Sequence, residues 1–196
     1  MTRDSSLTRA RLLDAAFAEF AAYGVAGARV DRIAESAGAN KRLIYVYFGN
    51  KEQLFDEVLQ RAMAEGAESV PFDVDDLPGY AGAIFDHLVE RPELMRLRLW
   101  RQLERPSVTS LEPEAFRRKS AEVGAAQQRG EVAQGMAPDD LLTMVLAVAQ
   151  AWFLAAEGDG ADTSGNRTWA KERLAMHRAA VVEAVRRISE PKGAAA

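Results

Sequence analysis

Residues 29–54 read RVDRIAESAGANKRLIYVYFGNKEQL, and the fold of the whole chain is best inferred from this stretch. Apolar residues recur at helical spacing on both sides of Gly38, which permits a sharp turn. Asn40 is a good N-cap for a helix that begins at Lys41. The pattern predicts two short helices joined by a glycine turn. The helices expected in this part of the chain span about residues 7–23, 30–37, 41–48 and 51–66, with Gly24 ending the first.

Three short helices with a glycine turn between the second and third describe a helix-turn-helix. The third helix must fit the major groove and present polar side chains outward. Arg42, near its start, matches guanine through a planar fork of donors, whereas Lys41, Tyr45, Tyr47 and Lys51 are suited to phosphates. The candidate DNA-binding residues are Arg29, Asn40, Lys41, Arg42, Tyr45, Tyr47 and Lys51.

Alternative interpretations exist for several of these side chains. Tyr45 and Tyr47 are two residues apart, so a helix cannot bury both on one face. With Ile44 and Phe48 facing inward, phosphate contacts are favoured over packing. Arg42 is expected to read a base because of its place in the third helix, although most surface arginines are simply solvated.

Spaced features within residues 8–60 resemble the DNA-binding domain of the tetracycline-repressor (TetR) family of bacterial regulators. They are Ile33-Ala34, the Ala37-Gly38 turn, Tyr45-x-Tyr47-Phe48 and Lys51-Glu52-x-Leu54. The resemblance implies a homodimer that binds a palindromic double-stranded DNA operator, represses transcription and is released by a small molecule. It also implies that Tyr45, Tyr47 and Lys51 touch the DNA backbone.

The chain departs from the family pattern at two places. Ala28 stands where relatives usually have a threonine that caps the second helix, which predicts a cap weaker by about 1 kcal/mol. Arg42-Leu43 replaces a common Gly-Thr in the recognition helix. This second change alters base reading, so no known operator can be carried over.

The rest of the chain is predicted to be helical as well, because strand signals are nearly absent. A loop is expected at 68–79 and another at 157–166, and the tail after Pro191 should be disordered. We predict an all-α protein with a DNA-binding domain at 1–50 and a helical-bundle ligand-binding and dimerisation domain at 51–196, in which 51–66 is the connecting helix. The further helices are expected at about 80–91, 92–104, 113–129, 138–156 and 168–189.

Charge and composition agree with a regulator of this kind. Residues 1–50 carry seven basic and five acidic residues, a net charge of +2 in a chain of net charge −4. The absence of cysteine excludes disulfides and thiolate metal sites. Neither a signal sequence nor a membrane span is apparent, which favours the cytoplasm.

The helix at 138–156 is apolar nearly all round and therefore needs cover on two sides. A second copy of this helix and of its neighbour at 168–189 is the simplest cover, in a four-helix bundle. The predicted interface residues are Leu141, Val145, Trp152, His177, Val181 and Val185, and Trp152→Glu is expected to split the dimer.

A mostly apolar ligand pocket is expected in the C-terminal domain, lined by Phe85, His87, Leu88, Leu97, Trp100, Met144 and Gln150. His87 is more easily explained as a hydrogen-bonded core residue, and Met63, Met95 and Met144 also fit as core filler.

No nucleophile, glycine-rich phosphate loop or metal cluster is visible, so we expect neither an enzyme nor a cofactor. The alternative function is a helical small-molecule-binding protein that has lost DNA binding, and a helical-bundle enzyme is disfavoured.

Overall fold

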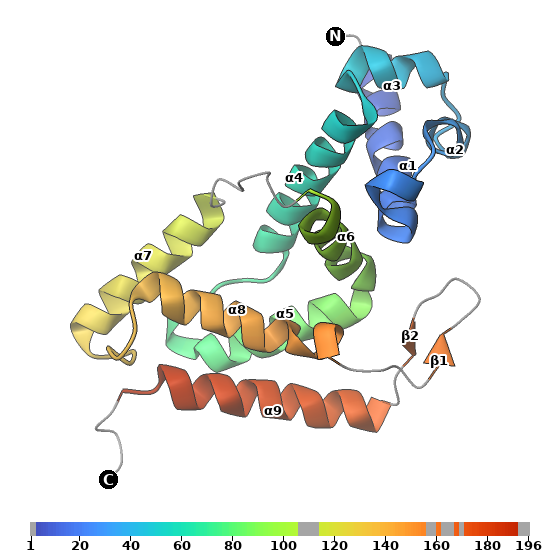
Figure 1. Cartoon of the computed structure of the whole chain (residues 1–196). Helices are drawn as coiled ribbons and strands as arrows, with labels where there is room; N and C mark the ends of the chain where they lie inside the picture. Colours follow the sequence, from blue (N-terminus) through green and yellow to red (C-terminus); the bar gives the residue numbers. More distant parts are fainter. Residues whose placement is uncertain (1–2, 106–113, 156–159, 162–166, 169–170, 192–196) are drawn as a thin grey trace. The chain divides into compact units, whose positions relative to one another are not determined.

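The computed structural model describes residues 3–105, 114–155, 160–161, 167–168 and 171–191 (Figure 1). These residues are almost entirely helical, which confirms the expected all-α class. A two-residue antiparallel pair, β1 (Gly160–Ala161) and β2 (Arg167–Thr168), lies where a loop was predicted. Most of that loop, the tail after residue 191 and Pro113 lie outside the described residues. Within the described part of the chain, no helix is long and apolar enough to cross a membrane.

The chain forms two compact units whose boundary differs from the predicted one. The first unit comprises Met1–Gly66 and Glu93–Ser110, and the second comprises Ala67–Pro92 and Leu111–Ala196. The segment Glu93–Ser110, which was expected in the C-terminal domain, therefore belongs with the N-terminal helices. The reason is tertiary, because helix α6 (Pro92–Glu104) makes hydrogen bonds to the first helix.

In the first unit, α6 joins four helices: α1 (Arg3–Gly27), α2 (Val30–Ser36), α3 (Lys41–Phe48) and α4 (Lys51–Ser69). The last three residues of α4 belong to the second unit. Phe20 and Phe55 pack edge to face between α1 and α4, with ring centroids 5.1 Å apart. Ile33, Ile44 and Leu54 are fully buried, so each short helix turns its predicted apolar face inward.

The predicted turns and caps between the helices of this unit are confirmed, although α1 begins at Arg3 rather than at Leu7 and α4 continues to Ser69. Gly24 adopts a positive φ of 69° and breaks α1, although a further short turn follows to Gly27. Gly38 also has a positive φ at the turn after α2. The Asn40 side chain accepts a 2.8 Å hydrogen bond from the Arg42 N–H, and the Asn50 side chain accepts one from Gln53.

In the second unit, α5 (Leu77–Glu90) packs against both α8 (Pro138–Ala155) and α9 (Lys171–Ser189), and α7 (Glu114–Arg129) packs against α8 (Figure 1). Helix α5 begins three residues earlier than predicted, because the Asp76 side chain caps it by accepting a hydrogen bond from the Gly79 N–H. A short 3-10 turn (Val74–Asp76) precedes it inside the predicted loop. The core of this bundle includes Leu141, Leu142, Val145, Val181 and Val185.

Candidate nucleic-acid interface

The outer face of α3 gathers polar side chains at adjacent helical positions. Lys41, Arg42 and Tyr45 are exposed, while Ile44 and Phe48 are buried beneath them. Tyr47 is partly buried and packs edge to face on Phe48. The predicted recognition helix therefore has the required division between an inward apolar face and an outward polar one.

Lys41 pairs with a carboxylate of the preceding helix. Its Nζ lies 2.8 Å from Asp31 Oδ1, and this hydrogen bond raises the pKa of Lys41. Both side chains are exposed, and ion pairs of this kind contribute little to stability. The lysine can consequently exchange this partner for a phosphate at small cost.

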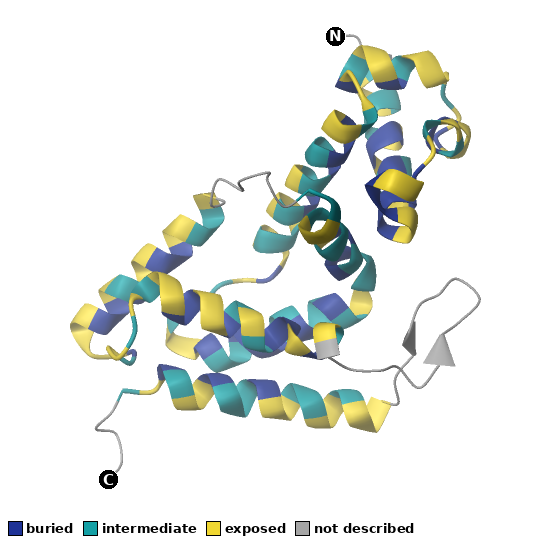
Figure 2. Cartoon of the chain, viewed as in Figure 1, coloured by how far each residue is buried: buried dark blue, intermediate teal, exposed yellow. Residues whose placement is uncertain are grey.

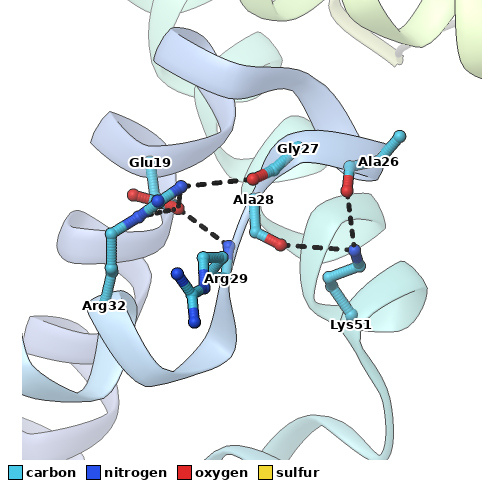
Figure 3. A network of polar contacts seen from close by, with 7 residues as sticks. All are labelled: Glu19, Ala26, Gly27, Ala28, Arg29, Arg32 and Lys51. Atoms are coloured by element: carbon cyan, nitrogen blue, oxygen red, sulfur yellow. Dashed lines mark hydrogen bonds and ion pairs between the residues drawn. The ribbon is translucent and has the colours of Figure 1, made fainter.

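Lys51, predicted as a phosphate clamp, is engaged with the backbone of the turn before α2. Its Nζ donates to the carbonyl oxygens of Ala26 and Ala28, at 3.5 and 3.3 Å (Figure 3). The ammonium thus ties the start of α4 to the turn that leads into α2. Lys51 has a structural role within this unit that sequence reasoning missed.

The capping of α2 differs from the sequence prediction. The residue at the N-cap position is Arg29, not Ala28, and its side chain makes no capping hydrogen bond. The carboxylate of Glu19, on α1, instead satisfies the N–H of the N-cap residue itself, because its Oε1 accepts a 2.8 Å hydrogen bond from the Arg29 N–H (Figure 3). An acceptor at the start of α2 is therefore present, although it comes from ten residues earlier in the chain.

Glu19 also holds the guanidinium of Arg32. The same Oε1 accepts hydrogen bonds of 2.8 and 2.6 Å from Arg32 Nε and Nη2, and Arg32 Nη2 further donates to Gly27 O (Figure 3). Glu19 is buried, so this pairing compensates for the removal of a charge from water. One sequence signal pointed to it, because Glu19 shares the apolar face of α1 with Leu12, Ala16 and Phe20.

Helix α6 makes hydrogen bonds to the short turn that follows the break in α1 at Gly24. Glu104 Oε2 accepts hydrogen bonds from the N–H groups of Val25 and Ala26, at 2.7 and 2.9 Å. The indole of Trp100 donates to Ala21 O at 3.3 Å. A Cβ on Gly24 would lie 2.8 Å from the Trp100 ring, so glycine is needed here for close approach as well as for its φ.

The residues predicted to line a ligand pocket fall into different units. Leu97 and Trp100 belong to the first unit, whereas Phe85, His87, Leu88, Met144 and Gln150 belong to the second. Trp100 contacts α1, and Met144 is 50% exposed, which corrects its interpretation as core filler. His87 forms a 3.2 Å hydrogen bond with Ser69, as its alternative interpretation expected, but it is only partly buried and is not a core residue.

An aromatic cluster in the second unit contains one predicted pocket residue and two predicted interface residues. His177 packs on Trp152 and Phe85, with centroid distances of 4.4 and 5.4 Å. Burial lowers the pKa of His177, and Arg173 adds to the shift. Its Nε2 is buried with no hydrogen-bond partner among the described residues.

The predicted dimer residues point into the protomer rather than away from it. Leu141, Val145, Val181 and Val185 are buried in the core of their own bundle, because α5 covers that side of α8 and α9. Trp152 is buried too, so Trp152→Glu is now expected to unfold this unit rather than split a dimer. The structure therefore makes these buried residues part of the protomer core, and not of an interface as the sequence predicted.

The outward side of α8 and α9 carries a different apolar set. Exposed residues recur along both helices in Figure 2. Met144, Leu154 and Met176 are 50%, 61% and 72% exposed. We call this surface the α8–α9 outer face: it comprises Met144, Ala147, Ala151 and Leu154 of α8, and Ala175, Met176, Ala179 and Ala180 of α9.

A helix-turn-helix that presents a polar recognition helix, carried by a chain with a second helical unit, defines a class of DNA-binding regulators. Residues 12–58 match the family model of bacterial regulatory proteins of the tetR family, and residues 76–187 match the tetracyclin repressor-like C-terminal domain. The chain belongs to the TetR family of bacterial transcriptional regulators.

Similar proteins include the HTH-type transcriptional repressor SCO4008 of Streptomyces coelicolor, which is 43% identical over 151 residues, 75% of this chain and 79% of that protein. The repressor NicS of Pseudomonas putida is 34% identical over 97 residues, 46% of each chain. The crystal structure of SCO4942, a proposed transcriptional regulator of Streptomyces coelicolor, superimposes with a TM-score of 0.75 at 35% identity. That match covers 93% of this chain and 98% of the other.

Proposed function

We propose that this chain is a homodimeric repressor that binds a palindromic operator through α3 and is released by a small molecule. The observation that carries the proposal is the outer face of α3, where Lys41, Arg42 and Tyr45 lie exposed over a buried apolar side. The relatives SCO4008 and NicS are both named as repressors, which supports repression rather than activation of transcription. The cytoplasm is the compartment that this function requires.

In this proposal Arg42 reads a guanine, while Arg29, Lys41, Tyr45, Tyr47 and Lys51 hold phosphates and Asn40 sets the start of the helix. The guanidinium of Arg42 can donate two parallel hydrogen bonds to guanine O6 and N7. Two copies of α3 in a dimer would enter half-sites about 34–36 Å apart, one turn of DNA.

Selection of binding sites from random duplex DNA tests this function on the full-length chain. A palindromic motif is expected. Arg42→Ala should reduce the binding free energy by about 1–3 kcal/mol through the loss of specificity at one base position of each half-site. Lys51→Ala should weaken binding to all DNA sequences alike. It should also reduce the slope of log binding constant against log salt concentration by about one. Failure to select any motif would favour a small-molecule-binding protein without DNA binding.

We place the dimer interface on the α8–α9 outer face. Small and apolar residues at helical spacing allow two helices to approach closely, and the inward sides of both helices are already occupied by their own core. A twofold axis would bring the same surface of each subunit together as a four-helix bundle.

We place the effector site in the second unit, at the aromatic cluster around Phe85, Trp152 and His177. Aromatic walls with a few polar groups are typical of small-molecule sites. The buried Nε2 of His177 offers a hydrogen-bonding group to a ligand. A thermal-shift screen would find ligands, and any true effector must weaken operator binding, because coupling between two sites is reciprocal. His177→Phe, which keeps an aromatic ring but removes Nε2, should reduce the affinity for the small-molecule ligand.

A further inference from the structure

The outer face of α3 contains one apolar side chain that its polar neighbours do not explain. Val46 is 64% exposed, which is more than the 48% of Tyr45 next to it. It follows Arg42 by four residues, so both side chains project from the same face of the helix. Val46 is not one of the buried residues that form the core of this unit.

Helix stability does not explain this valine either. A β-branched side chain loses rotamer freedom in a helix, so Val46 disfavours the helix slightly compared with alanine, lysine or glutamate. An exposed position on a short helix would gain from any of these replacements. An apolar residue that costs helix stability, on the surface that would face DNA, points to a role in binding.

We infer that Val46 reads thymine in the major groove through the 5-methyl group of that base. This inference rests on the proposed function, since it assumes that α3 enters the groove. The edges of the four base pairs present donors and acceptors, and the thymine methyl is the apolar group among them. Valine has no side-chain donor or acceptor, so contact with that methyl is the base reading available to it.

The spacing along α3 also predicts where the thymine lies. Four residues of an α-helix advance about 6 Å, and successive base pairs of DNA are about 3.4 Å apart. A helix lying along the groove therefore places Val46 about one to two base pairs from the guanine that Arg42 contacts. Each half-site should contain a thymine at that distance from the guanine.

Deoxyuridine provides the sharpest test, because it differs from thymine only by the missing methyl. The duplex used is the motif selected by the full-length protein, with deoxyuridine in place of the mapped thymine in both half-sites. Removing contact with one buried methyl should weaken wild-type binding about fourfold per half-site. Val46→Ala should bind the thymine and deoxyuridine duplexes with equal affinity.

Two controls separate base reading from general damage. Val46→Ala improves helix propensity, so its thermal unfolding should match or exceed that of the wild type. Leu103→Ala removes another exposed apolar side chain of the same unit, on α6, and should retain the full preference for thymine. Both variants are measured at the same salt concentration as the wild type.

The inference fails if the wild type binds the two duplexes equally, or if Val46→Ala keeps the wild-type preference for the thymine duplex. In either case selection of an operator motif would still support the proposed function. A protein that selects no motif at all contradicts the proposed function itself, and the two failures are thereby distinguished.

Discussion

The carboxylate of Glu104 lies 2.7 Å from the backbone nitrogen of Val25, 79 residues earlier in the chain. This contact joins the last turn of α6 to the short turn that follows the break in α1. That turn leads directly into α2 and α3, so a side chain outside the helix-turn-helix helps to fix where its helices begin.

Glu104→Ala should therefore destabilise the first unit. The N–H groups of Val25 and Ala26 would lose their acceptor, at an expected cost of about 1–2 kcal/mol in the free energy of unfolding. Operator affinity should fall for every sequence alike, because the position of the recognition helix becomes less defined. Urea denaturation and a binding titration measure the two effects. Gln102→Ala, an exposed change on the same helix, is the control, and equal stability of the two variants would contradict the prediction.

Glu19→Ala should be more damaging than loss of an ordinary helix cap. It removes the acceptor for the Arg29 N–H and leaves Arg32 without its carboxylate, so we expect a loss of about 1–3 kcal/mol. Arg29→Thr would supply a side-chain cap at the N-cap position itself. Adding Arg29→Thr to Glu19→Ala should recover about 1 kcal/mol of that loss. Denaturant unfolding of the two single variants and the double variant tests this, and a Glu19→Ala variant as stable as the wild type would contradict the prediction.

Ala151→Glu should separate the two subunits without unfolding them. Ala151 is exposed on the α8–α9 outer face, so a carboxylate is tolerated in the monomer but would be buried opposite its symmetry mate in the proposed dimer. Light scattering at micromolar concentration should show a dimer for the wild type and a monomer for the variant. Ala125→Glu, at an exposed position of α7, is the matched control and should stay dimeric. A dimer of unchanged affinity in Ala151→Glu would place the interface elsewhere.

We expect the buried Tyr80 to make the folded protein less stable at alkaline pH. Lys119 Nζ donates to its hydroxyl at 2.9 Å, and burial raises the pKa of Tyr80 from 10.0 to about 12. Burial also lowers the pKa of Lys119, so its ammonium loses its charge earlier than usual and offers the tyrosinate little support. Between pH 10 and 12 the unfolded chain gives up the tyrosine proton first, which favours unfolding as the pH rises.

Raising the pH from 9 to 11 should cost the wild type about 1.4 kcal/mol through this group. Tyr80→Phe should lack that component, although it loses the hydrogen bond from Lys119 and starts from lower stability. Chemical denaturation of both proteins at several pH values compares the slopes. Parallel slopes would mean that Tyr80 titrates at its ordinary value in the folded protein.

Much of the first unit follows from local sequence. The Asn40 and Asn50 caps, the glycine turns and the inward faces of α2 and α3 depend on residues within one or two helical turns, where propensity and spacing act directly. The all-α class and the recognition helix could therefore be predicted correctly from the residues alone.

The remaining features depend on side chains that are far apart in sequence. Glu19 as the acceptor at the start of α2, Glu104 as a support of α1 and the membership of α6 in the first unit all require contacts that no helical period encodes. The same limit explains why the residues predicted for the dimer interface are core residues instead. Helix α8 is apolar nearly all round, so periodicity could not tell which side α5 and α9 would cover. Only the packed bundle leaves Met144 and Ala151 outward while burying Leu141 and Val145.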